Sequence, residues 1–214
     1  YLAGASLLLK RNRPNETVTA LMRIDDLIQR MGGITKQLKS FARKNTESFV
    51  PVNFNDAFLS AMAIMEPQLK QAKVKIETLI EPEAVIIMAD QQRLEQVIIN
   101  LLRNALDAVM EVEEPEIKIS LYKDGSAIFL LRDNGKGISN LDTIFEPFQT
   151  TKDLGKGLGL GLAISSNIIS ELGGMLQAKN LSSNGAEFKI TLPLFDPSKI
   201  TVRETTNSNS GIET

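Results

Sequence analysis

The stretch Leu131–Ile164 reads LRDNGKGISNLDTIFEPFQTTKDLGKGLGLGLAI and decides which fold the sequence predicts. It holds six of the chain's 14 glycines, two in DNGKG and four at every second position of residues 155–161. So much glycine weakens a regular helix or strand, whereas a backbone that must approach a ligand closely requires it. The stretch is therefore predicted to be a loop wrapped around a bound molecule.

Asp133 is the first candidate functional residue. The apolar run SAIFLLRD, residues 126–133, reads as a strand that ends in its carboxylate. Asp-Asn-Gly is also a common turn sequence, which gives Asp133 a purely structural interpretation. The functional interpretation places the carboxylate at a pocket floor, where it accepts a hydrogen bond from the exocyclic amine of adenine. Guanine has a carbonyl at that position and would be repelled.

The second candidate is the glycine-rich sequence GKGLGLGLAI, residues 155–164, which leads into a helix predicted over 160–172. Accessible peptide N–H groups and the positive end of a helix dipole both attract anionic oxygens. The sequence is not a Walker A motif, which needs Gly-Lys followed by Ser or Thr, and it does not match a dinucleotide fingerprint. A glycine-rich helix start is a weak signal when it stands alone.

Two amides form the third candidate. Asn100 and Asn104 lie four residues apart in the predicted helix 90–112, so both project from one helix face. A buried amide on an otherwise apolar helix needs a partner. Capping a neighbouring loop or facing solvent would satisfy it. So would coordination of Mg²⁺, which takes oxygen ligands and often bridges nucleotide phosphates.

The composition narrows the class of protein. The 214 residues are 43% hydrophobic and carry 24 basic and 26 acidic side chains, a balance that gives no reason to expect general binding to nucleic acid or a membrane surface. The absence of cysteine excludes a disulfide framework, and the absence of histidine removes the commonest general base and metal ligand. No apolar run reaches the roughly 18 residues that span a bilayer.

Three regions follow one another along the chain. Residues 1–45 are expected to be the remnant of a helical hairpin, in which the amphipathic helix 16–44 has a coiled-coil-like seam. That helix either dimerises or packs within one monomer. Residues 46–195 are expected to form a second folded unit, and the polar sequence NTESFVPVNF, residues 45–54, looks like the linker into it. The polar tail 196–214 is predicted to be disordered from its first residue.

The middle region contains both helix and strand signals. Helices are predicted over residues 55–72, 90–112 and 160–172. Strands are indicated by VKIETLI, AVIIMA, EIKISLYK, SAIFLLRD, MLQAKNLS and AEFKITLPL. We therefore expect an α+β fold, a two-layer α/β sandwich with a mixed, mainly antiparallel sheet and helices on one face, preceded by the truncated helical hairpin.

The order of the three candidates is more specific than any one of them. NLLRNALDA resembles the N box of the GHKL ATPases, DNGKGI their first glycine box, FEPFQTTK their F box and GKGLGLGLAI their second glycine box. Within that superfamily the chain is similar to the sensor histidine kinases of two-component systems over about residues 50–195. FARK after the long helix and the extended GKGLGLGL are most similar to the C4-dicarboxylate sensor kinases. The usual F box has Phe where Gln149 stands.

The resemblance implies ATP and Mg²⁺ as cofactors and a role for each motif. Asn100 and Asn104 would be the catalytic residues, with Asn104 as the Mg²⁺ ligand. Residues 138–156 would form a lid over ATP anchored by Phe145 and Phe148, although both Phe residues are also compatible with ordinary core packing. The implied ATP-binding residues are Asn104, Asp107, Asp133, Gly135, Gly137, Ile138, Phe148, Thr151, Lys152, Gly157, Leu158, Gly159, Leu160 and Gly161.

The implied function is that of the ATP-binding catalytic domain of a sensor histidine kinase. Such a domain transfers the γ-phosphate of ATP to a histidine for relay to a response-regulator aspartate. Because this sequence has no histidine, the phosphoacceptor is expected outside it, and the fragment is expected to be unable to autophosphorylate. The alternative is a GHKL-fold ATP-binding module without kinase activity, either an ATPase or a regulatory interaction domain.

The resemblance also implies partners and a location. A cognate response regulator and, through the helical hairpin, a second copy of the full-length chain would be the partners, with no nucleic acid. The sequence starts with Tyr1 and is interpreted as part of a longer chain. Membrane contact would be made only through upstream segments, so the expected location is the cytoplasmic portion of a bacterial inner-membrane protein.

Overall fold

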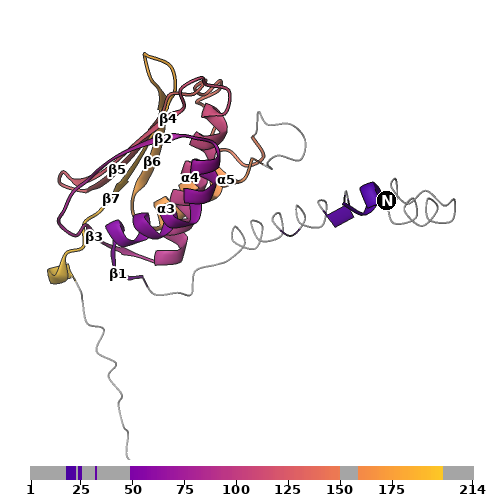
Figure 1. The fold of residues 1–214 in the computed structure, drawn as a ribbon. Helices are drawn as coiled ribbons and strands as arrows, with labels where there is room; N and C mark the ends of the chain where they lie inside the picture. Colours follow the sequence, from indigo (N-terminus) through magenta and orange to yellow (C-terminus); the bar gives the residue numbers. More distant parts are fainter. Residues whose placement is uncertain (1–17, 23, 26–31, 33–48, 150–158, 200–214) are drawn as a thin grey trace, which may run out of the picture.

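The computed structural model describes residues 18–22, 24–25, 32, 49–149 and 159–199. The strands and helices that form the folded domain lie within residues 49–149 and 159–199 (Figure 1). The elements in chain order are β1 (Val50–Asn53), α3 (Phe54–Gln71), β2 (Lys75–Ile80), β3 (Ile86–Ala89), α4 (Gln91–Val109), β4 (Glu116–Lys123), β5 (Ala127–Asp133), α5 (Gly161–Glu171), β6 (Met175–Asn180), β7 (Ala186–Leu192) and the 3-10 helix η1 (Pro197–Lys199).

A five-stranded sheet forms one layer of the domain. Its strand order is β2-β4-β5-β7-β6, in which β2 runs parallel to β4 and every other neighbouring pair is antiparallel. β1 and β3 form a separate antiparallel pair. The mixed, mainly antiparallel sheet expected from the sequence is confirmed.

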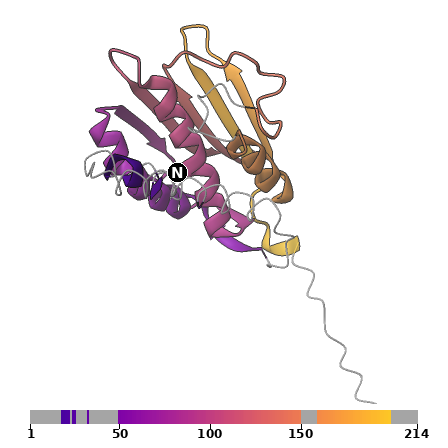
Figure 2. The same ribbon diagram turned by 90° about the vertical axis from the view of Figure 1, so that its right-hand side faces the viewer.

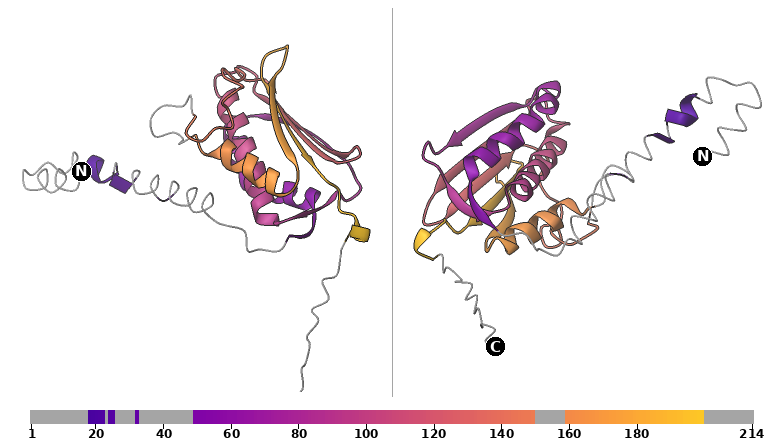
Figure 3. Two further views of the ribbon diagram at one scale, coloured as in Figure 1. Left: turned by 180° about the vertical axis from the view of Figure 1, so that it is seen from behind. Right: turned by 90° about the horizontal axis from the view of Figure 1, so that it is seen from below.

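Helices α3, α4 and α5 form the second layer and cover one face of the sheet, as Figures 1 and 2 show from two directions. The strands meet that layer with alternate side chains. In β4, for example, Ile117, Ile119 and Leu121 are buried. The view from behind in Figure 3 shows the same two layers, so the α+β two-layer sandwich is confirmed.

Helix α4 contacts both α3 and α5 and carries the first box of the predicted site. It starts where the Asp90 carboxylate accepts a hydrogen bond from the Arg93 backbone N–H at 3.1 Å, which satisfies one unpaired donor of the first turn. Its apolar residues recur every three or four positions and face the core. The buried ones are Leu94, Val97, Ile98, Leu101, Leu102, Ala105, Leu106 and Val109.

The prediction of a linker over residues 45–54 is wrong for its second half. Val50–Asn53 is strand β1, paired with β3, and Phe54 is fully buried at the first position of α3. The Phe54 ring stacks on Phe129 with 5.8 Å between ring centroids. Burial of this aromatic ring ties the segment to the core, an outcome that its polar neighbours concealed.

The predicted first region lies mostly outside the described residues. Residues 18–22, 24–25 and 32 are helical, in agreement with a helix over 16–44. The rest of the predicted seam and the preceding hairpin limb lie outside the described part of the chain.

The tail prediction needs a correction at its start. Residues 197–199 form the 3-10 helix η1, where the Asp196 carboxylate accepts hydrogen bonds from the backbone N–H of Ser198 at 3.0 Å and from its hydroxyl at 2.6 Å. These local side-chain bonds order the backbone beyond the last strand. None of the helices in the described ranges is both long enough and apolar enough to cross a membrane.

Candidate nucleotide-binding site

Asp133 ends strand β5 with a carboxylate that is 3% exposed. Its Oδ1 accepts hydrogen bonds from the backbone N–H of Gly135 at 2.9 Å and of Ala186 at 3.3 Å. Burial raises the pKa of Asp133 above its ordinary value of 3.8, and the two backbone donors oppose that shift only in part. Because both donors bond Oδ1, the other carboxylate oxygen is the one available to a ligand.

Two glycines allow close backbone packing around Asp133. A Cβ on Gly135 would lie 2.5 Å from the Ala108 carbonyl oxygen, so the loop after β5 packs directly on α4. A Cβ on Gly185 would lie 1.9 Å from the Asp133 carbonyl oxygen, and the Gly185 φ is +93°. Only glycine fits at Gly185, because it both permits a positive φ and removes the side chain.

Asn100 joins α4 to the start of α5. Its Nδ2 donates a hydrogen bond to the Ser165 hydroxyl oxygen at 3.0 Å. A Cβ on Gly161, the first residue of α5, would lie 2.3 Å from the Asn100 Oδ1. Asn100 therefore has a hydrogen-bond partner in helix α5, and its amide lies against the second glycine box.

The two glycine contacts define the site along α4. Gly161 meets α4 at Asn100 and Gly135 meets it at Ala108, with Asn104 midway between them. At about 1.5 Å of rise per residue the two contacts are roughly 12 Å apart. Asn104 is half-buried in this interval, and Asp107 is exposed one position before Ala108. The loop that begins at Asp133 and the start of α5 therefore both pack on the helix that carries Asn104.

The start of α5 is shaped to receive an anion. Leu160 is buried at the N-cap position, and its apolar side chain makes no capping hydrogen bond to the first turn of α5. The N–H groups of a helix's first turn and the helix dipole favour phosphate oxygens. Gly159 precedes them with a φ of +67°, and a Cβ there would lie 2.4 Å from the Gln149 carbonyl oxygen.

The donor set fits a magnesium ion bound together with phosphates. Among the described residues, no group of three or more His, Cys, Asp or Glu side chains could hold a metal. Mg²⁺ commonly takes only one or two protein oxygens and completes its shell with water and substrate phosphates. The Asn104 amide oxygen, between the Asp133 loop and the phosphate-attracting end of α5, is compatible with that arrangement.

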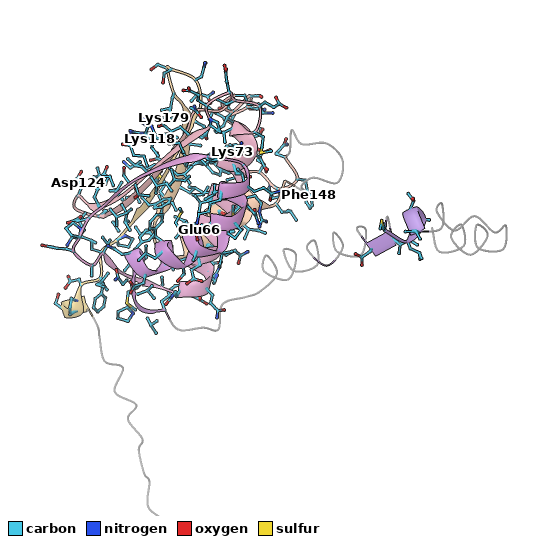
Figure 4. All side chains as sticks on the ribbon, in the orientation of Figure 1. Glu66, Lys73, Lys118, Asp124, Phe148 and Lys179 are labelled. Carbon is cyan, nitrogen blue, oxygen red and sulfur yellow. The ribbon has the colours of Figure 1, made fainter. Side chains whose placement is uncertain are left out.

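The F box divides into a packed part and an exposed part. Phe145 is partly buried and packs against the core, whereas Phe148 is 68% exposed and points away from the domain in Figure 4. Phe148 has a φ of +66°, and its N–H donates to the Gly159 carbonyl oxygen at 3.1 Å. Core packing therefore explains Phe145 and does not explain Phe148.

Ile138 follows the first glycine box and is held by a residue that sequence reasoning missed. Its backbone N–H donates to the Asn180 Oδ1 at 2.7 Å, and its carbonyl oxygen accepts from the Asn180 Nδ2 at 2.8 Å. Gly137, with a φ of +74°, gives Asn180 the space to approach. The contact joins residues 42 positions apart, so no local pattern marks it.

An ion cluster lies beside Asp133 on strands β5, β6 and β7. The buried carboxylate of Glu187 pairs with Arg132 and with Lys179. Burial acts to raise the pKa of Glu187, but the hydrogen bonds from Lys179 and Arg132 outweigh it and hold that pKa below its ordinary value. The cluster joins the strand that ends in Asp133 to the hairpin that bonds it.

Four predicted site residues lie outside the described residues: Thr151, Lys152, Gly157 and Leu158.

Comparison with known families agrees with this geometry. The family described as histidine kinase-, DNA gyrase B-, and HSP90-like ATPase matches residues 89–196, from the end of β3 to beyond β7. The chain belongs to this family, and its matched region is a GHKL-type ATP-binding catalytic domain.

Its relatives are sensor histidine kinases. The chain is 35% identical over 196 residues to the C4-dicarboxylate transport sensor protein DctB of Pseudomonas aeruginosa and 32% identical over 195 residues to DctB of Rhizobium meliloti. Each comparison covers 90% of this chain but only 32% and 31% of the relative, so the chain spans about a third of their length. The resemblance to C4-dicarboxylate sensor kinases is confirmed.

Solved structures of histidine kinases share the fold. The nucleotide-free catalytic domain of ThkA matches with a TM-score of 0.61 and 28% identity, covering 69% of this chain and 97% of that one. Full-length ShkA in complex with AMPPNP gives 0.68 and 26%, covering 84% and 38%. ThkA in complex with the response regulator TrrA gives 0.64 and 26%, covering 89% and 52%.

Proposed function

We propose that this chain binds Mg·ATP and presents the γ-phosphate to a histidine, as the catalytic part of a sensor histidine kinase that supplies a response regulator. The observation that carries the proposal is the convergence on α4 of the Asp133 loop, Asn104 and the start of α5. The family of the chain and its sensor-kinase relatives support it.

Asp133 selects the base in this proposal. Two backbone donors fix Oδ1 and orient the carboxylate, so the remaining oxygen accepts the adenine exocyclic amine. Gly135 lets the loop lie against α4, which sets the depth of the pocket. A guanine carbonyl in the same place would meet the carboxylate without a proton between them.

The phosphates lie toward the other end of the α4 contacts. Mg²⁺, when bound, neutralises phosphate charge during transfer. Asn104 would supply an amide oxygen to the metal, and the backbone N–H groups in the first turn of α5 would hold phosphate oxygens. Gly159 and Gly161 keep side chains out of that space.

Asn100 favours phosphoryl transfer over hydrolysis. The hydrolase branches of the superfamily that the chain resembles carry a water-activating glutamate where Asn100 stands. An amide does not accept a proton at neutral pH, and the Asn100 amide is bonded to Ser165. A kinase is therefore favoured over an ATPase, the alternative that the resemblance leaves open.

The partners are inferred from relatives. ThkA, a structural neighbour, was solved with the response regulator TrrA, and we propose a response regulator as partner here as well. The phosphoacceptor histidine must come from outside these 214 residues, which contain none. We also propose that the full-length protein dimerises through its helical hairpin and holds this domain on the cytoplasmic side of a bacterial inner membrane.

Isothermal titration with Mg·ATP tests the nucleotide site. Asp133→Asn should weaken ATP binding about ten- to a hundredfold, because a hydrogen bond to a charged group contributes about 1.5–3 kcal/mol. Asp124→Asn is the matched control, since Asp124 is exposed in the β4–β5 turn, well away from Phe148 in Figure 4. Equal affinity in Asp133→Asn and the control would remove Asp133 from the site.

Phosphate transfer is tested with ATP labelled at the γ-phosphate. The 214-residue chain alone should acquire no acid-labile label, because it has no histidine to accept it. A longer chain that includes a histidine-bearing hairpin helix should become labelled. Acid-labile labelling of the 214-residue chain would contradict the proposed mechanism.

A further inference from the structure

Asn180, the last residue of β6, bonds both peptide groups of Ile138. The Ile138 N–H donates to Oδ1 at 2.7 Å, and Nδ2 donates to the Ile138 carbonyl oxygen at 2.8 Å. A side-chain amide is the uncharged group that offers one acceptor and a donor side by side. Asn180 therefore pairs with Ile138 much as a neighbouring strand would.

The neighbouring glycine is explained by this contact. A Cβ on Gly137 would lie 2.9 Å from the Asn180 Oδ1 and 3.4 Å from the Gly185 carbonyl oxygen. The Gly137 φ of +74° also disfavours a side chain. Gly137, the second glycine of DNGKGI, thus leaves space for the Asn180 side chain to approach the loop.

Asn180 and the Asp133 contact belong to one rung of the β6–β7 ladder. Asn180 is the register partner of Ala186, whose N–H donates to the Asp133 Oδ1 at 3.3 Å. Ala186 therefore orients the Asp133 carboxylate, while its cross-strand partner Asn180 holds the Ile138 backbone. This residue pair fixes the position of Ile138 relative to Asp133.

We propose that Asn180 is a positioning residue for the nucleotide base. It holds Ile138, as one wall of the base pocket, at a set distance from the Asp133 carboxylate. This inference rests on the proposed function, because it assumes that Asp133 and Ile138 line the ATP site. Both hydrogen bonds of Asn180 are exposed to water, so their loss displaces Ile138 but changes folding stability little.

Two variants test the positioning role of Asn180. Asn180→Ala removes both hydrogen bonds, whereas Asn180→Asp keeps the shape but places a carboxylate oxygen against the Ile138 carbonyl oxygen. Each should weaken ATP and ADP binding by a similar factor of about ten, roughly the net effect of one hydrogen bond, because the base is common to both nucleotides. Ser183→Ala, exposed in the turn of the same hairpin, is the control and should leave both affinities unchanged.

Two further measurements separate positioning from a general structural role. The melting temperature of the nucleotide-free Asn180 variants should stay within about 2 °C of the parent, a shift equivalent to under 1 kcal/mol. Hydrogen exchange of the Ile138 amide should become faster in Asn180→Ala, while exchange in the core of β4 is unchanged.

The outcomes distinguish this inference from the function on which it rests. If the parent chain binds no ATP, the proposed function fails and the positioning role fails with it. If the parent binds ATP and both variants bind equally well, only the role of Asn180 is overturned. Loss of affinity for ATP but not ADP, or loss that parallels a large drop in melting temperature, would also overturn it.

Discussion

Gly161→Ala tests the contact that fixes α5 against α4. The added methyl carbon would lie 2.3 Å from the Asn100 Oδ1 and 3.1 Å from its Nδ2, far inside van der Waals contact. Asn100 cannot turn away freely, because its Nδ2 donates to the buried hydroxyl of Ser165. The substitution should therefore destabilise the domain although alanine is the better helix former.

The magnitude follows from three contributions. Overpacking costs about 1–3 kcal/mol, and displacing Asn100 from Ser165 adds about 0.5–1.5 kcal/mol. Replacing glycine by alanine in a helix offsets about 0.5–1 kcal/mol of this loss. Gly161→Ala should thus lower the free energy of unfolding by about 0.5–4 kcal/mol. In an Asn100→Ala background the methyl finds open space, and the same substitution should be neutral or stabilising by about 0.5–1 kcal/mol.

Urea unfolding of the parent, both single variants and the double variant completes the cycle. Circular dichroism of the nucleotide-free proteins gives the four free energies, with equal m-values as a check that the unfolding reaction is the same. We expect a coupling of roughly 3 kcal/mol between the two sites, because overpacking and the displaced hydrogen bond both disappear in the Asn100→Ala background. Additivity within about 0.5 kcal/mol would show that Asn100 and Gly161 do not compete for space, and a stabilising Gly161→Ala would show the same.

Four other substitutions have expected effects, one of them as a control. Gly135→Ala would force a methyl against the α4 backbone and should lower the melting temperature and weaken ATP binding, whereas Gly125→Ala, with open space but a φ of +61°, should affect only the melting temperature. Burial raises the pKa of Glu187 but its two basic partners lower it more. The ionised Glu187 therefore stabilises the fold above its ordinary pKa of 4.5, and this stabilisation is lost as the pH falls through the folded-state pKa. Glu187→Gln should accordingly flatten the acid side of a plot of unfolding free energy against pH. An unchanged acid side would refute this. Burial raises the pKa of Asp133, so the free energy of unfolding falls as the pH rises through the folded-state pKa. Asp133→Asn should therefore raise the melting temperature of the nucleotide-free domain more at neutral pH than near pH 4. Equal shifts at the two pH values would contradict the direction of the pKa shift.

The sequence was sufficient for the parts of the fold that depend on local periodicity. The buried positions of α4 recur every three or four residues, and β4 alternates buried and half-buried side chains, so both could be predicted from pattern alone. Asp133 could be singled out because a carboxylate that ends an apolar strand and precedes two glycines is unusual chemistry for a core. The structure places Asp133 buried at the end of β5, and its role in binding adenine stays a prediction.

The missed features all depend on contacts between distant segments. β1 is a strand only because β3 pairs with it, and its own sequence contains Pro51 and polar neighbours. Ala186 reaches Asp133 through a backbone N–H, which has no side-chain signature. Asn180 looks like one more polar residue at a strand end, and its role emerges only when Ile138 is placed beside it.

The conformation of Phe148 could not be predicted either. A left-handed φ is uncommon for an aromatic residue, and such strain persists only where surrounding contacts enforce it. Here the enforcing contact is the bond to Gly159, a residue that sequence analysis assigned to phosphate binding without linking it to the F box.

The short strand β3 is bonded to both ends of the domain. β1, the first strand, pairs with it, and after β7 the backbone N–H of Phe195 donates to the Ile86 carbonyl oxygen at 2.8 Å. Because β3 leads through Asp90, the N-cap residue, directly into α4, this small ladder connects both boundaries of the domain to the helix that carries Asn100 and Asn104.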